Sequence, residues 1–547
     1  MSISSKSPFL KIIKKAYELA RISRQPGAPT VDTLQLQIRT AREEYGRRRF
    51  LGDVSKVALY GGLAAMLPGC AKDDLLEGIP SGQMSFQRNP NQRLSIAIVG
   101  AGLAGLNCAY QLKKKGFDAT IYEGSNRIGG RVLTRQNFIA QGTYTECGGE
   151  FIDTGHKHMR DLAGEFGLTL LDTDTPSESG LLNDTFYIDG QHYSEAQVIN
   201  AFLPYANTIA SDIQSLPTNF DFTNYTPSVQ QFDSISISQY FDQIGMPSTL
   251  FLRKGLEQAY NTEYGREVND QSAINFLFLL TINPGNASYD IFGLSDERFK
   301  VMGGNQQIVD QLANNLAGQI QLQRKLTRIS MNANGQYVIR FQTGPNVTAD
   351  VCVITIPFTM LRQVDLSGLN LPAWKTNAIQ HLGYGTNSKL LLGFTGKQWR
   401  NLGHSGGIFS NGAPSNPTEF IQTGWDNTRL QTGSNGGYTV YQGGYQGLNL
   451  NLSQTQVMLD QLDAMWPGTA AQFNGTSKLI HWPSHPWSLA SYACWRVGQV
   501  TTMMGAEGKN VGNLYFAGEH CSLWFQGYME GAAETGFNVA KSLAQIV

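Results

Sequence analysis

Leu94-Ser-Ile-Ala-Ile-Val99 runs directly into Gly100-Ala-Gly102-Leu-Ala-Gly105, and after a helical stretch that ends near Lys115 the chain reads Ala119-Thr-Ile-Tyr-Glu123. The first run has the continuous apolar character of a buried strand, and the last is a second strand of the same kind. Glycines and a helix between two such strands predict a strand–helix–strand unit of about 30 residues. This unit decides the fold, because it predicts an α/β domain built on a parallel sheet.

The glycine-rich turn of this unit has the spacing of a dinucleotide site. The first glycine permits a tight turn, the second lets the backbone approach a pyrophosphate, and the helix behind them offers its N–H groups and the positive end of its dipole. An acidic residue about 20 residues further on can accept hydrogen bonds from a ribose diol. The pattern does not distinguish NAD from FAD. The residues that it assigns to the nucleotide are Gly100, Gly102, Leu103, Ala104, Gly105 and Glu123.

Two further elements narrow the choice of cofactor. Arg127-Ile-Gly129-Gly130-Arg131-Val132 follows the second strand closely, and Arg131 offers a fixed fork of donors to phosphate oxygens. Far along the chain, Leu514-Tyr-Phe-Ala-Gly518-Glu519-His520 leads to Gly527-Tyr528-Met529 and to a helix that runs to the C-terminus. The positive end of that helix would face whatever lies before it. The edge of a flavin, which becomes negative on reduction, is a suitable group to lie in front of this helix.

With these three elements the chain resembles the flavin amine oxidases, the superfamily of monoamine, polyamine and L-amino acid oxidases, over about residues 93–547. Residues 127–132 are similar to the second flavin signature of GR2-type flavoproteins. The resemblance implies an α/β fold in which a GR2-type, Rossmann-like FAD-binding domain is interleaved with a substrate domain. The FAD-binding domain is expected at 93–160, 296–370 and 500–547, and the substrate domain at 161–295, a helical insertion, and 371–499, a mixed sheet. Within the insertion, helical patterns predict helices at 196–215, 237–244, 248–264 and 272–280.

The resemblance also implies the catalytic residues. Lys389, at the end of Gly383-Tyr-Gly-Thr-Asn-Ser-Lys389, is similar to the family lysine that reaches flavin N5 through a water, although a lysine here also fits a solvated strand edge. Tyr492 and Tyr528 match two aromatic residues that face each other before the flavin and orient a flat amine, although both also fit a core role. Ser491 stands where monoamine oxidases place the cysteine that binds flavin covalently, which implies non-covalent FAD.

Other family positions fall on residues expected near FAD, and one of them is ambiguous. Glu150 is open to three interpretations: an acceptor near the flavin, a contact for a distal cationic group of the substrate, or a buried structural acid. Phe151 stands where L-amino acid oxidases carry the arginine that clamps the substrate carboxylate. Trp487 or Trp524 is expected at the rim of the substrate slot. The FAD contacts implied beyond the glycine-rich turn are Gly130, Arg131, Gly148, Gly149, Glu150, Leu326, Glu519 and Met529.

The implied function is that of a flavin-dependent amine oxidase. Hydride moves from the α-carbon of a neutral amine to flavin N5, and water hydrolyses the resulting imine to a carbonyl product. O2, giving H2O2, or a periplasmic electron carrier then reoxidises the flavin. One alternative is an L-amino acid oxidase that uses another arginine, such as Arg253 or Arg266. Two more are a carbon–carbon desaturase, which would leave Lys389 and the tyrosines unexplained, and a non-catalytic, flavin-stabilised interaction protein.

Composition restricts the partners. The chain has 547 residues, of which 41% are apolar, and a net charge of −1, which excludes a disordered chain and gives no reason to expect a nucleic-acid partner. No metal is expected, since the histidines show no ligand spacing. The sequence does not specify the oligomeric state, and a homodimer is compatible with it.

Residues 1–70 are expected to form an export signal. Residues 1–56 carry 12 Lys and Arg against 5 Asp and Glu, and an apolar run too short to span a bilayer follows. Arg47-Arg48-Arg49-Phe50-Leu51 resembles a twin-arginine signal, and Leu67-Pro68-Gly69-Cys70 resembles a lipobox. The mature protein would then begin near Cys70 as a periplasmic or lipid-anchored protein, with residues 71–92 as a linker. The alternative is a basic amphipathic helix, with a pattern over Phe9–Arg24, that stays in place.

Overall fold

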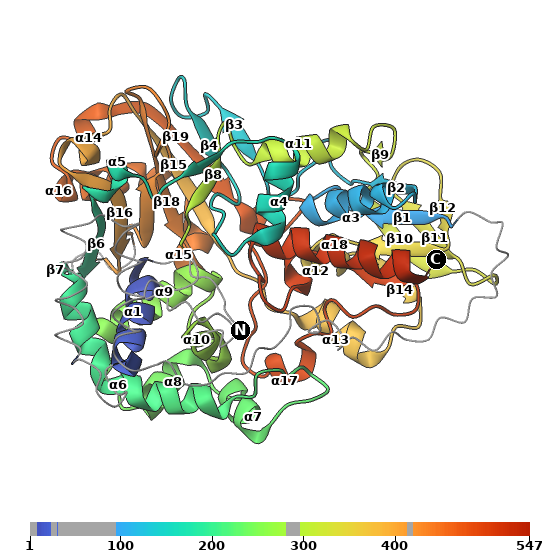
Figure 1. Cartoon of the computed structure of the whole chain (residues 1–547), viewed down its shortest axis with the longest axis horizontal. Helices are drawn as coiled ribbons and strands as arrows, with labels where there is room; N and C mark the ends of the chain where they lie inside the picture. Colours follow the sequence, from blue (N-terminus) through green and yellow to red (C-terminus); the bar gives the residue numbers. More distant parts are fainter. Residues whose placement is uncertain (1–7, 23–29, 31–93, 281–295, 413–418, 547) are drawn as a thin grey trace, which may run out of the picture.

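The computed structural model describes residues 8–22, 30, 94–280, 296–412 and 419–546, and every structural statement below refers to this part of the chain. The protein has two halves that lie side by side (Figure 1). In the view of Figure 1, a parallel sheet with its helices lies on the right, and a larger mixed sheet above a layer of helices lies on the left.

The first half is built on a five-stranded parallel sheet in the order β20-β13-β1-β2-β9. In its central strand β1, Ile96 and Ile98 face one core cluster and Ala97 and Val99 face another, so both faces of the sheet are buried. The predicted α/β fold class is confirmed. The strands are β1 (Ile96–Val99), β2 (Ala119–Tyr122), β9 (Ile320–Gln321), β13 (Val351–Ile354) and β20 (Leu514–Phe516).

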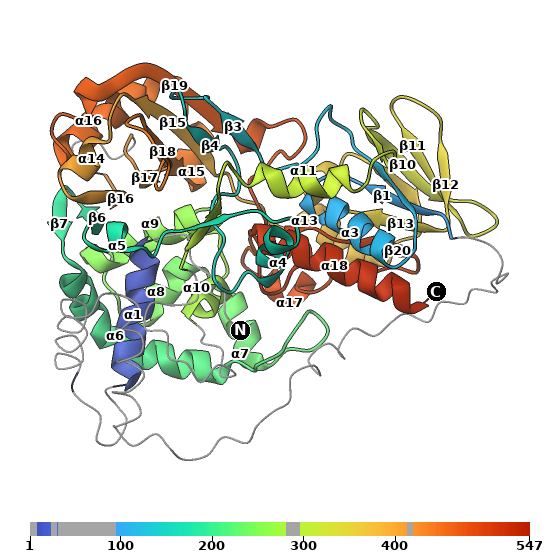
Figure 2. The same cartoon turned by 45° about the horizontal axis from the view of Figure 1, so that its top comes forward.

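Helices and a second sheet cover the two faces of the parallel sheet. On one face, α3 and α18 pack against each other, and α3 follows β1 directly (Figure 1). On the other face lies a four-stranded sheet in the order β12-β11-β10-β14 (Figure 2). The elements are α3 (Leu103–Lys114), α18 (Met529–Ile546), β10 (Leu326–Met331), β11 (Tyr337–Phe341), β12 (Val347–Ala349) and β14 (Asp365–Gly368), with α4 (Lys157–Glu165), α11 (Gln306–Asn314), α12 (Phe358–Leu361) and α13 (Ala373–His381) around them.

The second half is built on a seven-stranded mixed sheet in the order β19-β15-β18-β17-β16-β6-β7. Two of these strands come from the segment 161–295, which the sequence predicts as a helical insertion. The insertion therefore contributes strands as well as helices. The strands are β6 (Leu182–Ile188), β7 (Gln191–Tyr193), β15 (Ser388–Phe394), β16 (His404–Ser410), β17 (Thr423–Asp426), β18 (Gly436–Gln442) and β19 (Phe473–His481).

Below this sheet lies a layer of helices whose ends are set by local chemistry (Figure 1). Ser194 and Gln197 form a capping box at the start of α6, and Gly265 ends α9 in the left-handed conformation, with φ of 69°. All four helices predicted for this region are present, and α7 is an addition. The helices are α6 (Glu195–Ser215), α7 (Pro227–Asp233), α8 (Ile237–Gln243), α9 (Phe251–Tyr264) and α10 (Ala273–Leu280).

The N-terminal helix α1 (Pro8–Ile22) packs on the second half, against α6, α9 and β16. Its residues Phe9, Ile13 and Leu19 are completely buried and belong to the largest core cluster. These residues fall inside the predicted export signal, 1–70, whose arginine and lipobox motifs lie outside the described residues. A removable leader does not need to share the core, so the helix favours the alternative interpretation for its own fifteen residues.

Candidate functional site

A cavity extends between the two halves from the glycine-rich turn to a group of aromatic side chains. Gly105 does not line it, because this glycine serves packing: a Cβ there would lie 2.0 Å from the carbonyl oxygen of Gly100. All the other predicted site residues line the cavity: Gly100, Gly102, Leu103, Ala104, Glu123, Gly130, Arg131, Gly148, Gly149, Glu150, Leu326, Lys389, Tyr492, Glu519, Tyr528 and Met529.

The glycine-rich end of the cavity offers backbone donors. Gly100 has a φ of +109°, which an L side chain rarely adopts, and it turns the chain from β1 into α3. Gly102 is the N-cap of α3 and has no side chain that could cap the helix. The first N–H groups of α3 therefore remain available to an anion, and the helix dipole favours a negative charge at this place. This arrangement fits the pyrophosphate of FAD.

The acid at the end of β2 is held by backbone groups. Glu123 accepts a hydrogen bond from Ala101 N at Oε2 and one from Ser125 N at Oε1, both at 2.8 Å. Each oxygen has a second lone pair, which a ribose hydroxyl can use. Trp487 packs on the adjacent Gly124, where a Cβ would lie 2.5 Å from its ring.

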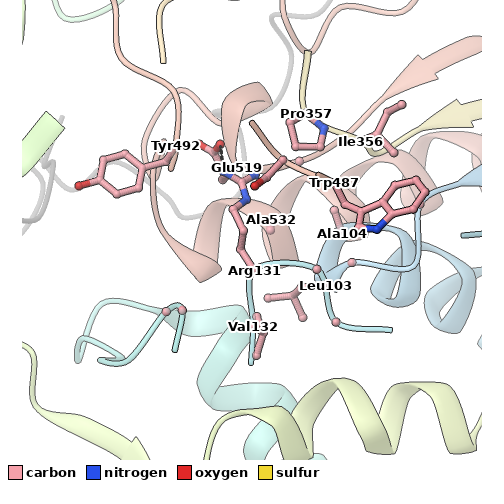
Figure 3. A pocket seen from close by; sticks show the side chains of 18 of the residues that line it. Leu103, Ala104, Arg131, Val132, Ile356, Pro357, Trp487, Tyr492, Glu519 and Ala532 are labelled. Carbon is pink, nitrogen blue, oxygen red and sulfur yellow. Dashed lines mark hydrogen bonds and ion pairs between the residues drawn. The ribbon is translucent and has the colours of Figure 1, made fainter. Parts of the chain in front are cut away.

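The position of Trp487 corrects one prediction. Figure 3 shows Trp487 and Tyr492 at opposite sides of the cavity, so Trp487 belongs to the nucleotide end and not to the rim of the substrate slot. Trp524 does not line the cavity. Both predictions of a tryptophan at the rim are therefore wrong. Trp487 precedes Tyr492 by five residues in the same motif, but the intervening turn separates the two side chains.

Arg131 connects the second flavin signature with the last segment of the chain. Its Nη1 lies 3.1 Å from Oε1 of Glu519 and also donates to the carbonyl oxygen of Ser491 (Figure 3). Glu519 accepts a further hydrogen bond, from Gly527 N at 2.8 Å, at its other oxygen. Ser491 donates its hydroxyl to Asn387 Oδ1 at 2.7 Å. These contacts join four segments that are far apart in the sequence around the middle of the cavity.

Lys389 lies on β15 and points into this middle region. It is buried, and its Nζ donates to Glu146 O at 3.0 Å and to Gly148 O at 2.9 Å. The same Nζ lies 3.1 Å from Glu150 Oε2. A solvated strand edge is therefore excluded for Lys389, because all three contacts lie inside the protein. The lysine carries its charge next to the Gly148–Gly149 backbone that lines the cavity.

Glu150 is shared by two buried lysines. Its Oε1 lies 2.9 Å from Nζ of Lys300, and its Oε2 binds Lys389. Burial by itself raises the pKa of Glu150, but the charges of Lys300 and Lys389 outweigh it, so the pKa lies below its usual value. Of its three interpretations, the structure supports the buried structural acid. Both oxygens already bind protein ammonium groups, which argues against a contact with a distal cationic group of the substrate.

At its far end the cavity is lined by aromatic side chains that hydrogen bonds hold in place. Tyr492 donates to the carbonyl oxygen of Glu263 at 2.6 Å, and the hydroxyls of Tyr441 and Tyr492 lie 2.9 Å apart. Tyr528 donates to Glu263 Oε1 at 3.0 Å. One residue at the end of α9 thus fixes both predicted tyrosines. Trp425 adds another wall, with its ring centroid 5.5 Å from that of Tyr441.

Burial prevents Tyr492 and Tyr441 from acting as acids or bases. It raises the pKa of Tyr492 well above the usual value, and the nearby Tyr441 and Glu263 raise it further. Burial likewise raises the pKa of Tyr441. Both phenols therefore stay protonated in ordinary buffers. They can orient a substrate, but they cannot take its proton.

The aromatic end is acidic. Asp153 and Glu297 line the cavity, and Asp153 accepts a hydrogen bond from Glu297 N at 2.9 Å through Oδ1. Asp153 is 2% exposed, and within the described residues its Oδ2 has no hydrogen-bond partner; Nε2 of His156 lies 3.4 Å from it. A buried carboxylate oxygen of this kind attracts a cationic group that enters the cavity.

In the described part of the chain, no arginine reaches this end to clamp a carboxylate. Arg253 is buried in α9, where it pairs with Asp242 and Glu257. Arg266 pairs with Asp270 and donates to a backbone carbonyl. The suggestion that either could bind a substrate carboxylate is therefore wrong. The arginines that do line the cavity donate to protein groups elsewhere, namely Arg127 to Gly130 O, Arg131 to Glu519 and Arg324 to Pro345 O.

Sequence reasoning missed several residues of the aromatic end. Tyr441 lies directly opposite Lys389 in the β15–β18 pair, and on the neighbouring β17 Trp425 lies two residues beyond Thr423, the residue opposite Tyr441. Alternation along each strand puts these side chains on the same face of the sheet. The alternation is visible in the sequence, but the pairing that brings the three strands together is not. Lys300, Glu263 and Asp153 carried no local signal.

Comparisons with known proteins agree with this geometry. The model of the family described as flavin containing amine oxidoreductase matches residues 103–544. An L-amino-acid oxidase of Daboia russelii is 23% identical, over 86% of this chain and 93% of its own length, and probable polyamine oxidase 4 of Arabidopsis thaliana is 23% identical over 87% and 92%. Among solved structures, cyclohexylamine oxidase from Brevibacterium oxydans superposes with a TM-score of 0.71 at 19% identity, over 83% of this chain and 99% of that one.

Proposed function

The chain belongs to the flavin-containing amine oxidoreductase family, and from this premise we propose that it oxidises an amine that carries no α-carboxylate. It is a flavin-dependent amine oxidase with FAD as its cofactor. The observation that carries the proposal is the aromatic, acidic end of the cavity. Asp153 and Glu297 line this end, while Arg253 and Arg266 are bound elsewhere.

Charge at this end favours an amine over an amino acid. An α-carboxylate would approach Asp153 and Glu297 without an arginine to pair with, and an unpaired charge that leaves water costs several kcal/mol. An ammonium group is attracted by the same acids before it loses its proton. Phe151 stands where L-amino acid oxidases carry the arginine that clamps the substrate carboxylate. Its apolar ring has its centroid 5.9 Å from that of Trp425. Tyr441, Tyr492 and Tyr528 complete an enclosure suited to an apolar or aromatic amine.

The residues at the two ends of the cavity have different roles in the reaction: the glycine-rich end holds the cofactor, and the aromatic end holds the substrate. FAD supplies the two-electron oxidation of the carbon–nitrogen bond. The N-terminus of α3, Glu123 and Arg131 would hold its phosphates and ribose, and the aromatic side chains would orient the α-carbon of the amine and exclude water. Lys389 holds a positive charge beside the Gly148–Gly149 backbone. This ammonium group would stabilise negative charge that develops when the flavin is reduced. The oxidised substrate is an imine, which water hydrolyses to a carbonyl product and ammonia or an amine.

Further parts of this proposal concern the cofactor linkage, the electron acceptor and the location. Ser491 has no thiol, so FAD is held without a covalent bond. O2, reduced to H2O2, or a periplasmic electron carrier takes the electrons. The twin-arginine-like motif at residues 47–51 and the lipobox-like motif ending at Cys70 support export and a lipid anchor, and both motifs lie outside the described residues. None of the described helices is long and apolar enough to span a bilayer.

Anaerobic reduction of the bound flavin tests the substrate proposal. Each amine is paired with its α-carboxylated counterpart, phenethylamine with phenylalanine and cadaverine with lysine, and bleaching of the flavin absorbance is followed in a stopped-flow instrument. We expect each amine to reduce the flavin at least tenfold faster, which corresponds to ~1.4 kcal/mol of transition-state preference. An amino acid that is faster than its amine by the same factor would favour an L-amino acid oxidase, and no bleaching at all would favour a protein without turnover.

A further inference from the structure

The apolar face of α1 is seated in a fitted groove of the substrate-binding half. Phe9, Ile13, Ala16 and Leu19 recur at intervals of three and four residues, which places them on one side of the helix, and all four are completely buried. In Figures 1 and 2, α1 lies along α6 and close to α9. An isolated helix of fifteen residues is marginal in water, so α1 owes its stability to this groove.

The groove fits the first aromatic residue of α1, Phe9. The ring of Phe9 stacks on Phe409 of β16, with centroids 5.0 Å apart and planes at 21°, and meets Phe186 of β6 edge-on at 6.0 Å. On the third side lies Gly255 of α9, where a Cβ would come within 2.5 Å of the Phe9 ring. Glycine in a helix interior destabilises the helix relative to alanine. The contact with Phe9 gives a physical reason for glycine at this position.

A polar contact fixes the register of the helix. Lys15 is 6% exposed, and its Nζ pairs with Glu195 in the first turn of α6. Glu195 also lies at the positive end of the α6 dipole, which favours a carboxylate there. Because Lys15 is buried, a shift in the register of α1 would break this ion pair at a cost in stability.

Helix α9 connects the groove to the aromatic end of the cavity. Gly255 lies in the middle of α9, and Glu263, two turns further on, accepts hydrogen bonds from Tyr492 and Tyr528. Phe9 presses on the backbone of the same helix that sets the distance between these tyrosines. The position of α1 is thus coupled to the substrate site through a single rigid element.

We propose that α1 is a permanent part of the substrate-binding half, and that it stays bound there after the chain is cut between residues 31 and 93. In such a cut, water adds across one peptide bond and leaves a new carboxylate and a new ammonium group. None of the contacts of α1 described above lies in that segment. The product of processing near Cys70 is then a two-piece enzyme that retains α1, and the groove formed by α6, α9, β6 and β16 is an interaction surface for that piece.

The test uses the full chain with FAD bound. A recognition site for a sequence-specific protease is inserted between Ser81 and Gly82, the protein is cut, and gel filtration with intact-mass spectrometry detects the N-terminal piece. We expect the piece to elute with the flavoprotein at one copy per chain, and residues 8–22 to exchange their amide hydrogens as slowly as α6 does. If the piece elutes alone while the melting temperature and the flavin-reduction rate of the remainder stay unchanged, the proposal is overturned.

A matched pair of helical glycines sharpens the test. Gly255→Ala introduces a Cβ that collides with Phe9, whereas Gly164→Ala in α4 introduces one that has no atom within 4 Å. After cutting, Gly255→Ala should release the N-terminal piece at protein concentrations at least tenfold higher than the control does. Its flavin should be reduced by amine more slowly, at unchanged flavin content. Loss of the piece from the Gly164→Ala control as readily as from Gly255→Ala would overturn the proposal. If Gly255→Ala does not fold, the exchange rates of residues 8–22 in the uncut wild-type chain decide: exchange as fast as in an unprotected peptide overturns it.

Discussion

The two ends of the cavity are built from different chemical groups. At the glycine-rich end the backbone does the binding, through the turn at Gly100, the uncapped start of α3 and glycines where a Cβ would collide with a neighbour. At the aromatic end side chains from several elements do it, among them Trp425, Tyr441 and Tyr528. Substitutions at the first end should therefore destroy the cofactor site or the fold, while substitutions at the second should change rate and substrate preference.

The largest effect is expected from Gly105→Ala. The new Cβ would lie 2.0 Å from the carbonyl oxygen of Gly100, which is backbone and cannot move aside, so we expect no soluble, flavin-loaded protein. Gly102→Ala is the matched control, because no protein atom lies within 4 Å of its Cβ. This variant should fold and bind FAD weakly, since the methyl group occupies the path of the pyrophosphate. Flavin absorbance per chain after gel filtration, together with thermal unfolding, measures both effects. A stable, yellow Gly105→Ala protein would contradict the packing argument.

Lys389→Met tests the middle of the cavity, where the two ends meet. Loss of the ammonium group should slow reoxidation of the reduced flavin by roughly 10²–10³-fold, because a fixed charge in a dry site stabilises the negative charge that develops there. Reduction by amine should slow less. Stopped-flow measurement of the two half-reactions separates these effects, and a protein acceptor should be tried beside O2.

Lys300→Met is the control for that experiment. Lys300 binds the other oxygen of Glu150, so its removal also breaks a buried ion pair, yet it does not contact the carbonyl oxygen of Gly148. Both variants should lower the free energy of unfolding, since breaking a buried pair typically costs about 3–5 kcal/mol. Of the two variants, only Lys389→Met should slow reoxidation of the flavin more than its reduction. Equal slowing in the two variants would assign the effect to Glu150 and not to Lys389.

The difference between the two ends also explains what the sequence could predict. Glycine positions such as Gly100 and Gly102 are specified by local backbone demands, so a short motif is enough to find them. Helices α6, α8, α9 and α10 were predictable because their helical patterns are separated by Pro and Gly breaks. The cofactor end and the fold class therefore followed from the sequence.

The aromatic end could be predicted only in part, because long-range pairing assembles it. Tyr441 comes opposite Lys389 only when β18 pairs with β15, and no local pattern states that pairing. Glu150 illustrates the same limit: its two lysines come from β8 (Phe299–Val301) and β15, and neither partner is near it in the sequence. Trp487 was misplaced because neighbours in a loop need not point in the same direction. A turn in the backbone carries it to the nucleotide end.

Asp153→Asn tests whether charge at the aromatic end selects the substrate. The amide keeps an oxygen that can accept the hydrogen bond from Glu297 N, but it removes the buried negative charge. We expect the preference for phenethylamine over phenylalanine to fall by up to about tenfold, or ~1.4 kcal/mol. Asp310→Asn, an exposed acid on α11, is the control and should leave the preference unchanged. The ratio of anaerobic flavin-reduction rates measures it. An unchanged ratio in Asp153→Asn would place the selectivity in shape alone.

The smallest effect concerns the pH dependence of flavin reduction. It shows whether the substrate amine or Tyr492 is the group that titrates. Hydride leaves readily only from a neutral amine, so the rate of reduction divided by the dissociation constant should rise with pH until the substrate amine is deprotonated, near pH ~10 for an alkylamine. Loss of the proton of Tyr492 would break its bond to Glu263 O and produce a falling limb. Because burial holds the pKa of Tyr492 well above the usual value, no falling limb should appear below that pH. The inflection should therefore move with the pKa of the chosen amine and stay within about half a unit in Tyr492→Phe. A falling limb below pH 10 that disappears in Tyr492→Phe would show that the tyrosine titrates, and the aromatic end would then act in acid–base chemistry as well as in orientation.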